Sequence, residues 1–229
     1  LGLGLALSLA RGIPQADAAF RAGTERWGGD GNAGARLLSG SDVGIIGFGD
    51  LGRALARVLA GFRPRLRAHD PWVAPSVLRQ AGVGPATLDE VLAESDTVFC
   101  VAAATTENRG FLDAAAFARM RPGAAFVLLS RAAVVDFDAL AAAVASGRIA
   151  AATDVYPEEP LPQGHPLRAL PRLLHSAHRA GALDVAFKRM GEMVLEDMAL
   201  LDRGLPPMVC KRAERETVAR MRSAPVTRN

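Results

Sequence analysis

Residues 43–53 read VGIIGFGDLGR, a short apolar run that leads into three glycines spaced as G-x-G-x-x-G. The apolar run is typical of a buried strand, and residues 51–59 are typical of a helix. Gly47 allows a tight turn, Gly49 lets a diphosphate approach the backbone, and Gly52 lets the helix pack closely on the strand. The strand, the glycine turn and the helix together predict a dinucleotide-binding unit.

An acidic residue follows the next predicted strand at a spacing that suits such a site. Asp70 comes eighteen residues after Gly52 and directly after His69. Its carboxylate is expected to accept hydrogen bonds from the adenosine ribose hydroxyls and to repel a 2′-phosphate, which favours NAD over NADP. Arg65 and Arg67 precede it and keep NADP open as the alternative. The turn residues expected to line the cofactor are Gly47, Phe48, Gly49, Asp50, Leu51 and Gly52.

The rest of the chain alternates fully apolar runs with helical patterns. Thr87 and Glu90 form a capping box that predicts a short helix ending near Ser95. Apolar strands separated by helices indicate a parallel sheet covered on both faces, so the expected fold is α/β with a doubly wound parallel sheet of Rossmann type. Further strands are expected at 97–102, 124–130 and 148–155, and further helices near 113–119 and 136–146.

The composition excludes several classes of protein. Half of the 229 residues are hydrophobic and 22% are charged, which is unlike a disordered chain, a collagen or a disulfide-stapled miniprotein. Cys100 lies in an apolar run far from Cys210, which predicts a buried free thiol rather than a disulfide or a metal ligand. No metal site is expected. Because no run of eighteen apolar residues occurs, no membrane span is expected either.

The net charge of +3 is concentrated at the C-terminal end. Residues 211–229 contain six basic and two acidic side chains and carry +4, which leaves 3 − 4 = −1 on the first 210 residues. A basic tail on a near-neutral body is more typical of a solvated segment than of a nucleic-acid footprint. We therefore expect no nucleic-acid partner, and we interpret residues 206–229 as a basic tail.

The N-terminal residues LGLGLALSLA resemble the apolar core of a signal peptide but lack a preceding Met and a basic segment. Leu3, Leu7 and Arg11 recur at helical spacing, and Gly12 and Pro14 interrupt the pattern. These features favour a helix whose first residues precede Leu1, in a chain truncated at its N-terminus. The apolar face of this helix must be buried somewhere, which favours a homodimer.

Polar side chains cluster where the predicted strands end, which is the edge at which open α/β sheets bind ligands. Taken alone, each of these residues could be an unrelated surface residue. The residues concerned are Ser130, Arg131, Asp154, Glu158, Glu159, His175 and His178.

The sequence resembles the NAD-dependent D-isomer-specific 2-hydroxyacid dehydrogenases. The matching stretches run in family order over roughly residues 1–207 and read VGIIGFGDLGR, TTENRGFL, MRPGAAFVLLSRAAVVD, AATDVYPEEPLP and AHRAGA. The resemblance implies a Rossmann-type NAD-binding domain over residues 1–182. It also implies that residues 183–205 form the returning C-terminal helix of a smaller, flavodoxin-like substrate domain, most of which is absent from this chain.

The resemblance further implies roles for individual residues. Arg131 matches the family's substrate-binding arginine, Glu159 its catalytic glutamate and His178 its acid–base histidine. Asp154 matches the aspartate that contacts the nicotinamide carboxamide. The family spacing, five residues after the aspartate, selects Glu159 rather than Glu158. The other residues implied to line the cofactor cleft are Thr105, Asn108, Leu129 and Ser130, together with Arg131 and His178.

The chemistry of a 2-oxo acid reduction suits these residue types. The reaction needs a hydride at C2 and a proton on the ketone oxygen, and histidine is the simplest proton donor at neutral pH. The Glu159 carboxylate should favour protonated His178 and fix its orientation. Arg131 offers a bidentate match for the substrate carboxylate and can polarise the ketone.

Two residues near the predicted site have no settled role. Arg179 stands where the family commonly has an aliphatic residue. If Arg179 faces the cleft, it favours 2-oxo acids with a second acidic group. If it points away, as alternation along an extended segment favours, it is a surface residue. His175 has no role in the family and is interpreted as a supporting or surface histidine.

The expected function is hydride transfer between NAD(H) and a small 2-hydroxy or 2-oxo acid by a cytoplasmic homodimer. A formate-dehydrogenase-like enzyme is an alternative, but such enzymes use glutamine where this chain has Glu159. A non-catalytic NAD-sensing corepressor or scaffold also stays open, because some relatives of that kind keep the catalytic residues.

Overall fold

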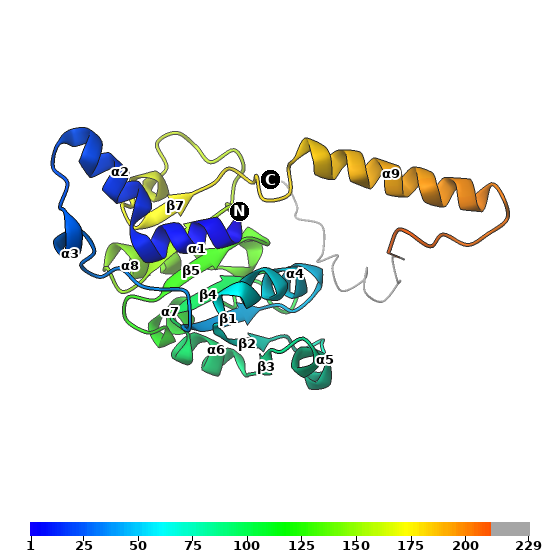
Figure 1. Ribbon diagram of the computed structural model, residues 1–229, viewed down its shortest axis with the longest axis horizontal. Coiled ribbons are helices and arrows are strands. Elements are labelled where there is room, and N and C mark those ends of the chain that lie inside the picture. Colours follow the sequence, from blue (N-terminus) through cyan, green and yellow to red (C-terminus); the bar gives the residue numbers. More distant parts are fainter. Residues whose placement is uncertain (212–229) are drawn as a thin grey trace.

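A parallel sheet forms the centre of the computed structural model, which describes residues 1–211 (Figure 1). Its strands are β1 Asp42–Ile46, β2 Arg65–His69, β3 Gly84–Pro85, β4 Thr97–Cys100, β5 Ala125–Leu128, β6 Ala150–Thr153 and β7 Leu173–His175. They are ordered β3-β2-β1-β4-β5-β6-β7, and every pairing is parallel. The strand order reverses between β1 and β4, where open sheets leave a crevice for a ligand. The predicted doubly wound α/β fold is confirmed.

Helices cover both faces of the sheet (Figure 1). On one face lie α1 Gly2–Arg11 and α4 Asp50–Leu59, and on the other lie α6 Leu88–Glu94, α7 Ala114–Arg119 and α8 Phe137–Ala145. The predicted capping box is confirmed, since Thr87 accepts from the Glu90 N–H and Glu90 accepts from the Thr87 N–H. The remaining helices of the described chain are α2 Ile13–Ala22, α3 Gly28–Gly31, α5 Pro75–Gln80 and α9 Asp184–Leu201, with short 3-10 turns at Ala60–Phe62, Ala132–Val134 and Pro166–Ala169.

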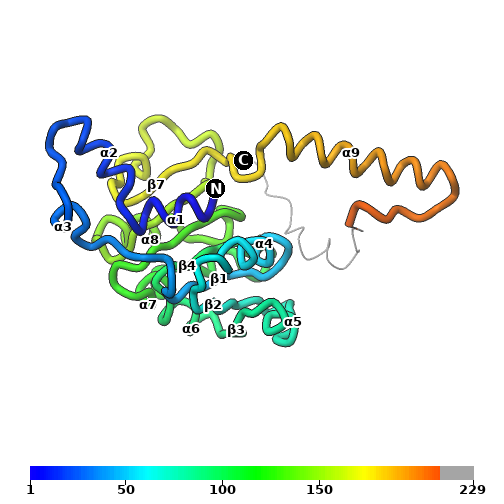
Figure 2. The backbone as a smooth tube through the Cα atoms, viewed as in Figure 1, coloured from blue at the N-terminus to red at the C-terminus, as the bar shows by residue number. Residues whose placement is uncertain are grey.

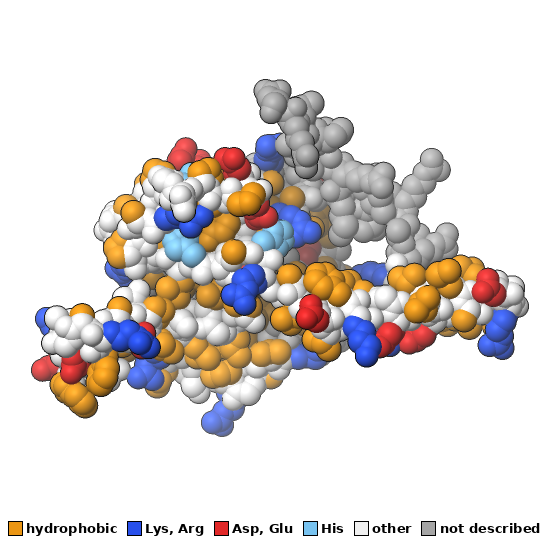
Figure 3. All heavy atoms as spheres, turned by 90° about the horizontal axis from the view of Figure 1, so that it is seen from above, with side chains coloured by type: hydrophobic (Ala, Val, Ile, Leu, Met, Phe, Trp, Pro, Cys, Tyr) orange, Lys and Arg blue, Asp and Glu red, His pale blue; other side chains and the backbone are white. Residues whose placement is uncertain are grey.

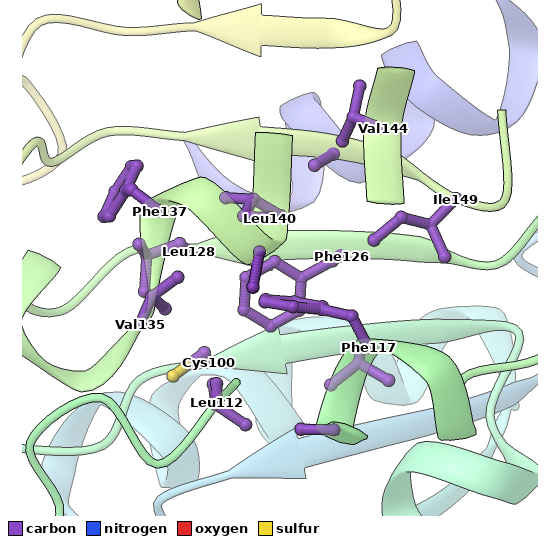
Figure 4. Packing of buried hydrophobic residues seen from close by; sticks show 14 of the residues in the cluster. Cys100, Leu112, Phe117, Phe126, Leu128, Val135, Phe137, Leu140, Val144 and Ile149 are labelled. Atoms are coloured by element: carbon purple, nitrogen blue, oxygen red, sulfur yellow. The ribbon is translucent and has the colours of Figure 1, made fainter. Parts of the chain in front are cut away.

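Adjacent strand residues point into different layers of the core. Phe99 packs with Val127 beneath α1, whereas Cys100 packs with Phe126 and Leu128 in the larger cluster beneath α7 and α8 (Figure 4). Cys100 is a free thiol, and burial raises its pKa to about 11, so it stays protonated at neutral pH. Both apolar faces of the sheet are thus covered by the chain's own helices.

The N-terminal helix α1 packs against its own sheet. Gly12 ends it with a left-handed φ of 60°, and Ala6 is fully buried in a cluster with Leu38 and Val43. The predicted helix is confirmed, and β5 and β6 of the same chain cover part of its apolar face: Leu3, Leu5, Leu7 and Leu9 are partly buried, and Leu1 is 56% exposed. The homodimer itself stays a prediction.

Helix α2 and helix α5 were not predicted from the sequence. Pro14 does not end helical structure but lies in the first turn of α2, where its missing N–H costs no hydrogen bond. Pro75 begins α5 in the same way. Strand β3 also escaped prediction, because two residues are too few to show a periodic pattern.

Helix α9 leaves the body of the molecule as an arm about 27 Å long; Figure 2 shows the chain turning back along it. Asp197 is the buried residue of α9. Large apolar side chains lie exposed along the arm (Figure 3); they are Val185, Phe187, Met190, Val194, Leu195, Met198 and Leu201. The predicted C-terminal helix is confirmed, and its assignment to a second domain stays a prediction.

Among the described residues, no helix combines the length and the apolar character needed to cross a membrane. Of the basic tail predicted over residues 206–229, residues 212–229 lie outside the described residues.

Candidate active site

The carboxyl-terminal residues of six strands form one row across the sheet. The paired positions run His69, Ile46, Cys100, Leu128, Thr153 and His175. Neighbouring strands are about 4.8 Å apart, so the segments that leave this row start close to one another. The predicted residues that follow the row directly are Asp70, Gly47, Leu129 and Asp154, and those on the loops beyond it are Thr105, Asn108, Ser130, Arg131, Glu159 and His178. The structure therefore brings the predicted site residues to one edge of the sheet.

The glycine turn after β1 has the geometry that its sequence predicts. Gly47 has a φ of 93°, and a Cβ there would lie 2.6 Å from the main chain of Ala102. A Cβ on Gly52 would lie 2.4 Å from the Gly47 carbonyl oxygen. Gly49, in contrast, has no heavy atom within 4 Å of the position a Cβ would take. The first and third glycines are needed for packing, and the second faces open space at the N-terminus of α4.

Asp70 ties the glycine turn to the segment that follows β2. Its Oδ2 accepts a hydrogen bond from the Phe48 N–H at 2.6 Å, and its Oδ1 accepts from the Trp72 N–H at 2.9 Å. The Phe48 side chain is fully buried in the core, so only its main chain can contribute to a site at this turn. Asp50 and Leu51 are exposed on the first turn of α4.

The loops after β4 and β5 hold the next predicted residues. Asn108 shapes its loop by accepting from the Thr105 N–H at 2.7 Å and by donating to the Ala103 carbonyl at 2.8 Å. Thr105 and Ser130 are buried. Arg131 is exposed, and its Nη1 donates to the Ser130 carbonyl at 2.8 Å. Arg131 thus stands at the end of β5, with β6 between it and the strand that leads to His178.

His178 and Glu159 form a direct pair. Nδ1 of His178 lies 2.6 Å from Oε2 of Glu159, and the Tyr156 N–H donates to Oε1 of Glu159 at 2.9 Å. Partial burial alone would raise the pKa of Glu159, but the hydrogen bonds from His178 and Tyr156 outweigh it and leave the pKa below its ordinary value. The His178 side chain is half exposed, so the pair lies at the surface of the molecule.

Asp154 holds the main chain around His178. It is fully buried, and its carbonyl accepts from the His178 N–H at 2.7 Å. Its two carboxylate oxygens accept from the N–H groups of Arg179 and Ala180, both at 2.8 Å. His178 adopts a left-handed φ of 53°, which non-glycine residues rarely do. The Arg179 side chain is exposed.

Residues 3–180 match the model of a protein family described as D-isomer specific 2-hydroxyacid dehydrogenase, NAD binding domain. The chain belongs to this family. It carries the family's NAD-binding domain, and its cofactor is NAD.

Several known members of the dehydrogenase family are similar to this chain. D-3-phosphoglycerate dehydrogenase of Mycobacterium bovis is 34% identical over 199 residues, which cover 86% of this chain and 37% of that protein. Glyoxylate reductase of Thermococcus onnurineus is 33% identical over 216 residues, which cover 91% of this chain and 64% of that protein. This chain therefore spans less than two fifths of the length of the mycobacterial relative.

Solved structures of the family agree in fold. A phosphoglycerate oxidoreductase from Rhizobium etli is 67% identical, with a TM-score of 0.88 over 94% of this chain and 66% of that one. The apo-structure of D-lactate dehydrogenase from Escherichia coli is 29% identical, with a TM-score of 0.74 over 91% of this chain and 65% of that one.

The sequence patterns do not indicate one residue that lies near the His178–Glu159 pair. This residue is Tyr156, the chain's one tyrosine. Its position between Asp154 and Glu159 is the feature of the sequence that could have indicated it. Its ring stacks on His175 with centroids 6.1 Å apart, and its hydroxyl lies 3.0 Å from Nδ1 of His175. Burial raises the pKa of Tyr156 and lowers that of His175, so both are uncharged at neutral pH. His175 therefore supports the loop that carries Glu159.

The groups at the glycine turn suit NAD. The open backbone at Gly49 and the N-terminus of α4 suit a diphosphate, and Asp70 lies beside this turn, directly after β2. No cluster of three metal-ligating side chains occurs among residues 1–211.

Proposed function

We propose that this protein interconverts 2-oxo acids and D-2-hydroxy acids with NAD(H), using His178 and Glu159 as an acid–base pair and Arg131 as the ligand of the substrate carboxylate. The observation that carries the proposal is the 2.6 Å contact between His178 Nδ1 and Glu159 Oε2. The pair lies at the same edge of the sheet as the glycine turn, so a proton donor and a hydride donor can act on one carbonyl group.

The cofactor-binding residues in this proposal divide into two groups. The backbone at Gly49 and the N-terminus of α4 bind the diphosphate, while Asp70 accepts from the adenosine ribose and disfavours a 2′-phosphate. The loops after β4 and β5 enclose the nicotinamide half; their lining residues are Thr105, Asn108, Leu129 and Ser130. Bound NADH supplies the hydride that adds to C2 of the 2-oxo acid.

The acid–base step follows from the orientation of His178. Because Nδ1 faces Glu159, Nε2 is the nitrogen that gives a proton to the ketone oxygen during reduction and accepts it during oxidation. The Glu159 carboxylate stabilises the protonated imidazole and keeps the ring in this orientation. Arg131 binds the substrate carboxylate and draws electron density from the ketone.

The substrate class we propose is a 2-hydroxy acid with a second anionic group. Mycobacterial relatives and the 67% identical Rhizobium structure are named for phosphoglycerate, and Arg179 adds an exposed cation beside His178. In this proposal Arg131 binds the carboxylate and Arg179 binds the second anion.

Turnover with purified protein tests the function. NADH oxidation is followed with a phosphorylated 2-oxo acid, with glyoxylate and with pyruvate, for the unmodified protein and for His178→Gln. Turnover of any of these acids that falls about 10²–10⁴-fold in the variant supports the acid–base assignment. NADH binding without any turnover would point instead to the NAD-sensing alternative.

A further inference from the structure

We propose that Lys211 is a cofactor-binding residue, carried to the glycine turn by the segment 206–211 and binding the diphosphate of NAD. The inference rests on the proposed function, in which the diphosphate lies at Gly49 and the start of α4. It adds a residue from the far end of the chain to that site.

The segment before Lys211 has a fixed position. After α9 ends at Leu201, the chain turns at Gly204 and runs back along the helix (Figure 2). Asp197 of α9 is 5% exposed, and its carboxylate accepts three main-chain hydrogen bonds. The donors are the N–H groups of Met208 at 2.7 Å, Val209 at 2.8 Å and Cys210 at 2.7 Å. These bonds lower the pKa of Asp197 to about 2, so the carboxylate stays charged and holds the segment at neutral pH.

The residue after this clamp reaches the start of α4. Nζ of Lys211 lies 3.0 Å from Oδ2 of Asp50, a residue 161 positions earlier in the chain. Their side chains are 82% and 77% exposed. An ion pair that is so exposed contributes about 0–1 kcal/mol to stability. The pair therefore does little for the fold, and its effect is to place a cation at Asp50, the residue that follows Gly49.

A cation is needed at this position because Asp50 is otherwise unfavourable there. A carboxylate in the first turn of a helix stabilises the helix dipole, but it repels a diphosphate bound at the same N-terminus. The Lys211 ammonium offsets the charge of Asp50 and has two donors left for phosphate oxygens. Its exposed side chain can turn from Asp50 to the diphosphate without displacing packed groups.

The chain offers a matched control for this role. Lys188 and Lys211 are its two lysines, and Lys188 lies on the exposed surface of α9. We expect Lys211→Met to raise the Kd for NADH about 5- to 10-fold, Lys211→Arg to keep it within about twofold, and Lys188→Met to leave it unchanged. The Kd is measured by NADH fluorescence at two salt concentrations, and the effect of Lys211→Met should shrink at high salt.

Two further binding measurements locate the contact. Lys211→Met should weaken the binding of ADP as much as that of NADH and leave the binding of adenosine unchanged, because ADP and NADH carry a diphosphate and adenosine does not. Asp50→Asn should tighten NADH binding, because it removes a carboxylate that repels the diphosphate and competes with it for Lys211.

Amine acetylation read by mass spectrometry gives an independent result. Saturating NADH should slow acetylation of Lys211 and leave Lys188 unaffected. If the unmodified protein binds NADH but Lys211→Met and Lys188→Met behave alike, the inference about Lys211 is overturned and the proposed function stands. Failure of the unmodified protein to bind NADH would overturn both. Tighter NADH binding by Lys211→Met would show that the segment obstructs the site and would also overturn the inference.

Discussion

His178 contacts Glu159 with Nδ1 and Oε2 2.6 Å apart, although its own backbone lies in the left-handed region at a φ of 53°. A non-glycine residue in that region costs about 1–2 kcal/mol relative to ordinary backbone. The cost is offset because Asp154 binds the main chain of His178 and of the two residues after it. The position of the proposed proton donor thus depends on two carboxylates, one at the ring and one at the backbone.

Replacing Glu159 with Gln should lower kcat for 2-oxo acid reduction by about tenfold or more, because the His178 ring loses the charged partner of its Nδ1. The measurement is kcat at saturating NADH for both proteins. An unchanged kcat would mean that Glu159 only packs against the ring.

The same contact predicts the sign of a stability effect. The folded-state pKa of Glu159 is lowered, so its ionised form stabilises the fold above the unfolded-state value, and this contribution is lost as pH falls through the folded-state pKa. Glu159→Gln should therefore have a lower free energy of unfolding than the unmodified protein at neutral pH, and the difference should shrink below about pH 4. Urea unfolding at both pH values measures this difference.

Replacing Asp154 with Ala should lower the free energy of unfolding by about 2–4 kcal/mol, because the N–H groups of Arg179 and Ala180 lose their charged acceptor. Asp154→Asn keeps one acceptor oxygen and should lose less. In Asp154→Asn, kcat should fall more than NADH affinity if the main role is to position His178. A larger loss of NADH affinity would instead support the predicted contact with the nicotinamide carboxamide.

Replacing Asp70 should relax the preference for NADH over NADPH. Asp70→Ala also removes the acceptor of the Phe48 N–H, so Asp70→Asn is the better probe: it removes the charge and keeps one oxygen for the turn. The ratio of the Kd values for NADPH and NADH should fall in both variants. Equal affinity of the unmodified protein for the two cofactors would contradict the role given to Asp70.

Arg179→Ile should separate two classes of substrate. If Arg179 binds a second anion, kcat/KM should fall more for a phosphorylated or dicarboxylic 2-oxo acid than for a 2-oxo acid with an uncharged side chain. Expressed as a free energy, the extra loss of transition-state stabilisation should be about 1.5–3 kcal/mol. Equal losses for both would leave Arg179 as a surface residue.

The protein is expected to sediment as a homodimer at micromolar concentration. Besides the partly covered apolar face of α1, a second apolar surface is exposed: Trp27 is 76% exposed and pairs edge-to-face with Phe20, which is 63% exposed. Exposed aromatic side chains of this size are typical of interfaces. Trp27→Ser should weaken the dimer, and a monomer in analytical ultracentrifugation would contradict the expectation.

Local patterns predicted the main elements because each leaves its own signal in the sequence. The glycine spacing indicated the turn after β1, and Thr87 with Glu90 indicated the start of α6. The sequence pattern does not predict helix α2, because Pro14 resembles a helix end, although proline is also favoured in a first turn. The Lys211–Asp50 contact could not be predicted, since no local rule relates residues 161 positions apart.

The row of paired strand ends has a consequence for how this enzyme family can change. The hydrogen-bonded strand ends, from Ile46 across to His175, fix where each of the loops that carry the site residues begins. A loop residue such as Arg179 can therefore be exchanged while the starting points of all these loops stay in place. Insertion of one residue within β6, in contrast, would reverse the faces of Thr153 and Asp154, and the Asp154 carboxylate would no longer reach the N–H groups of Arg179 and Ala180.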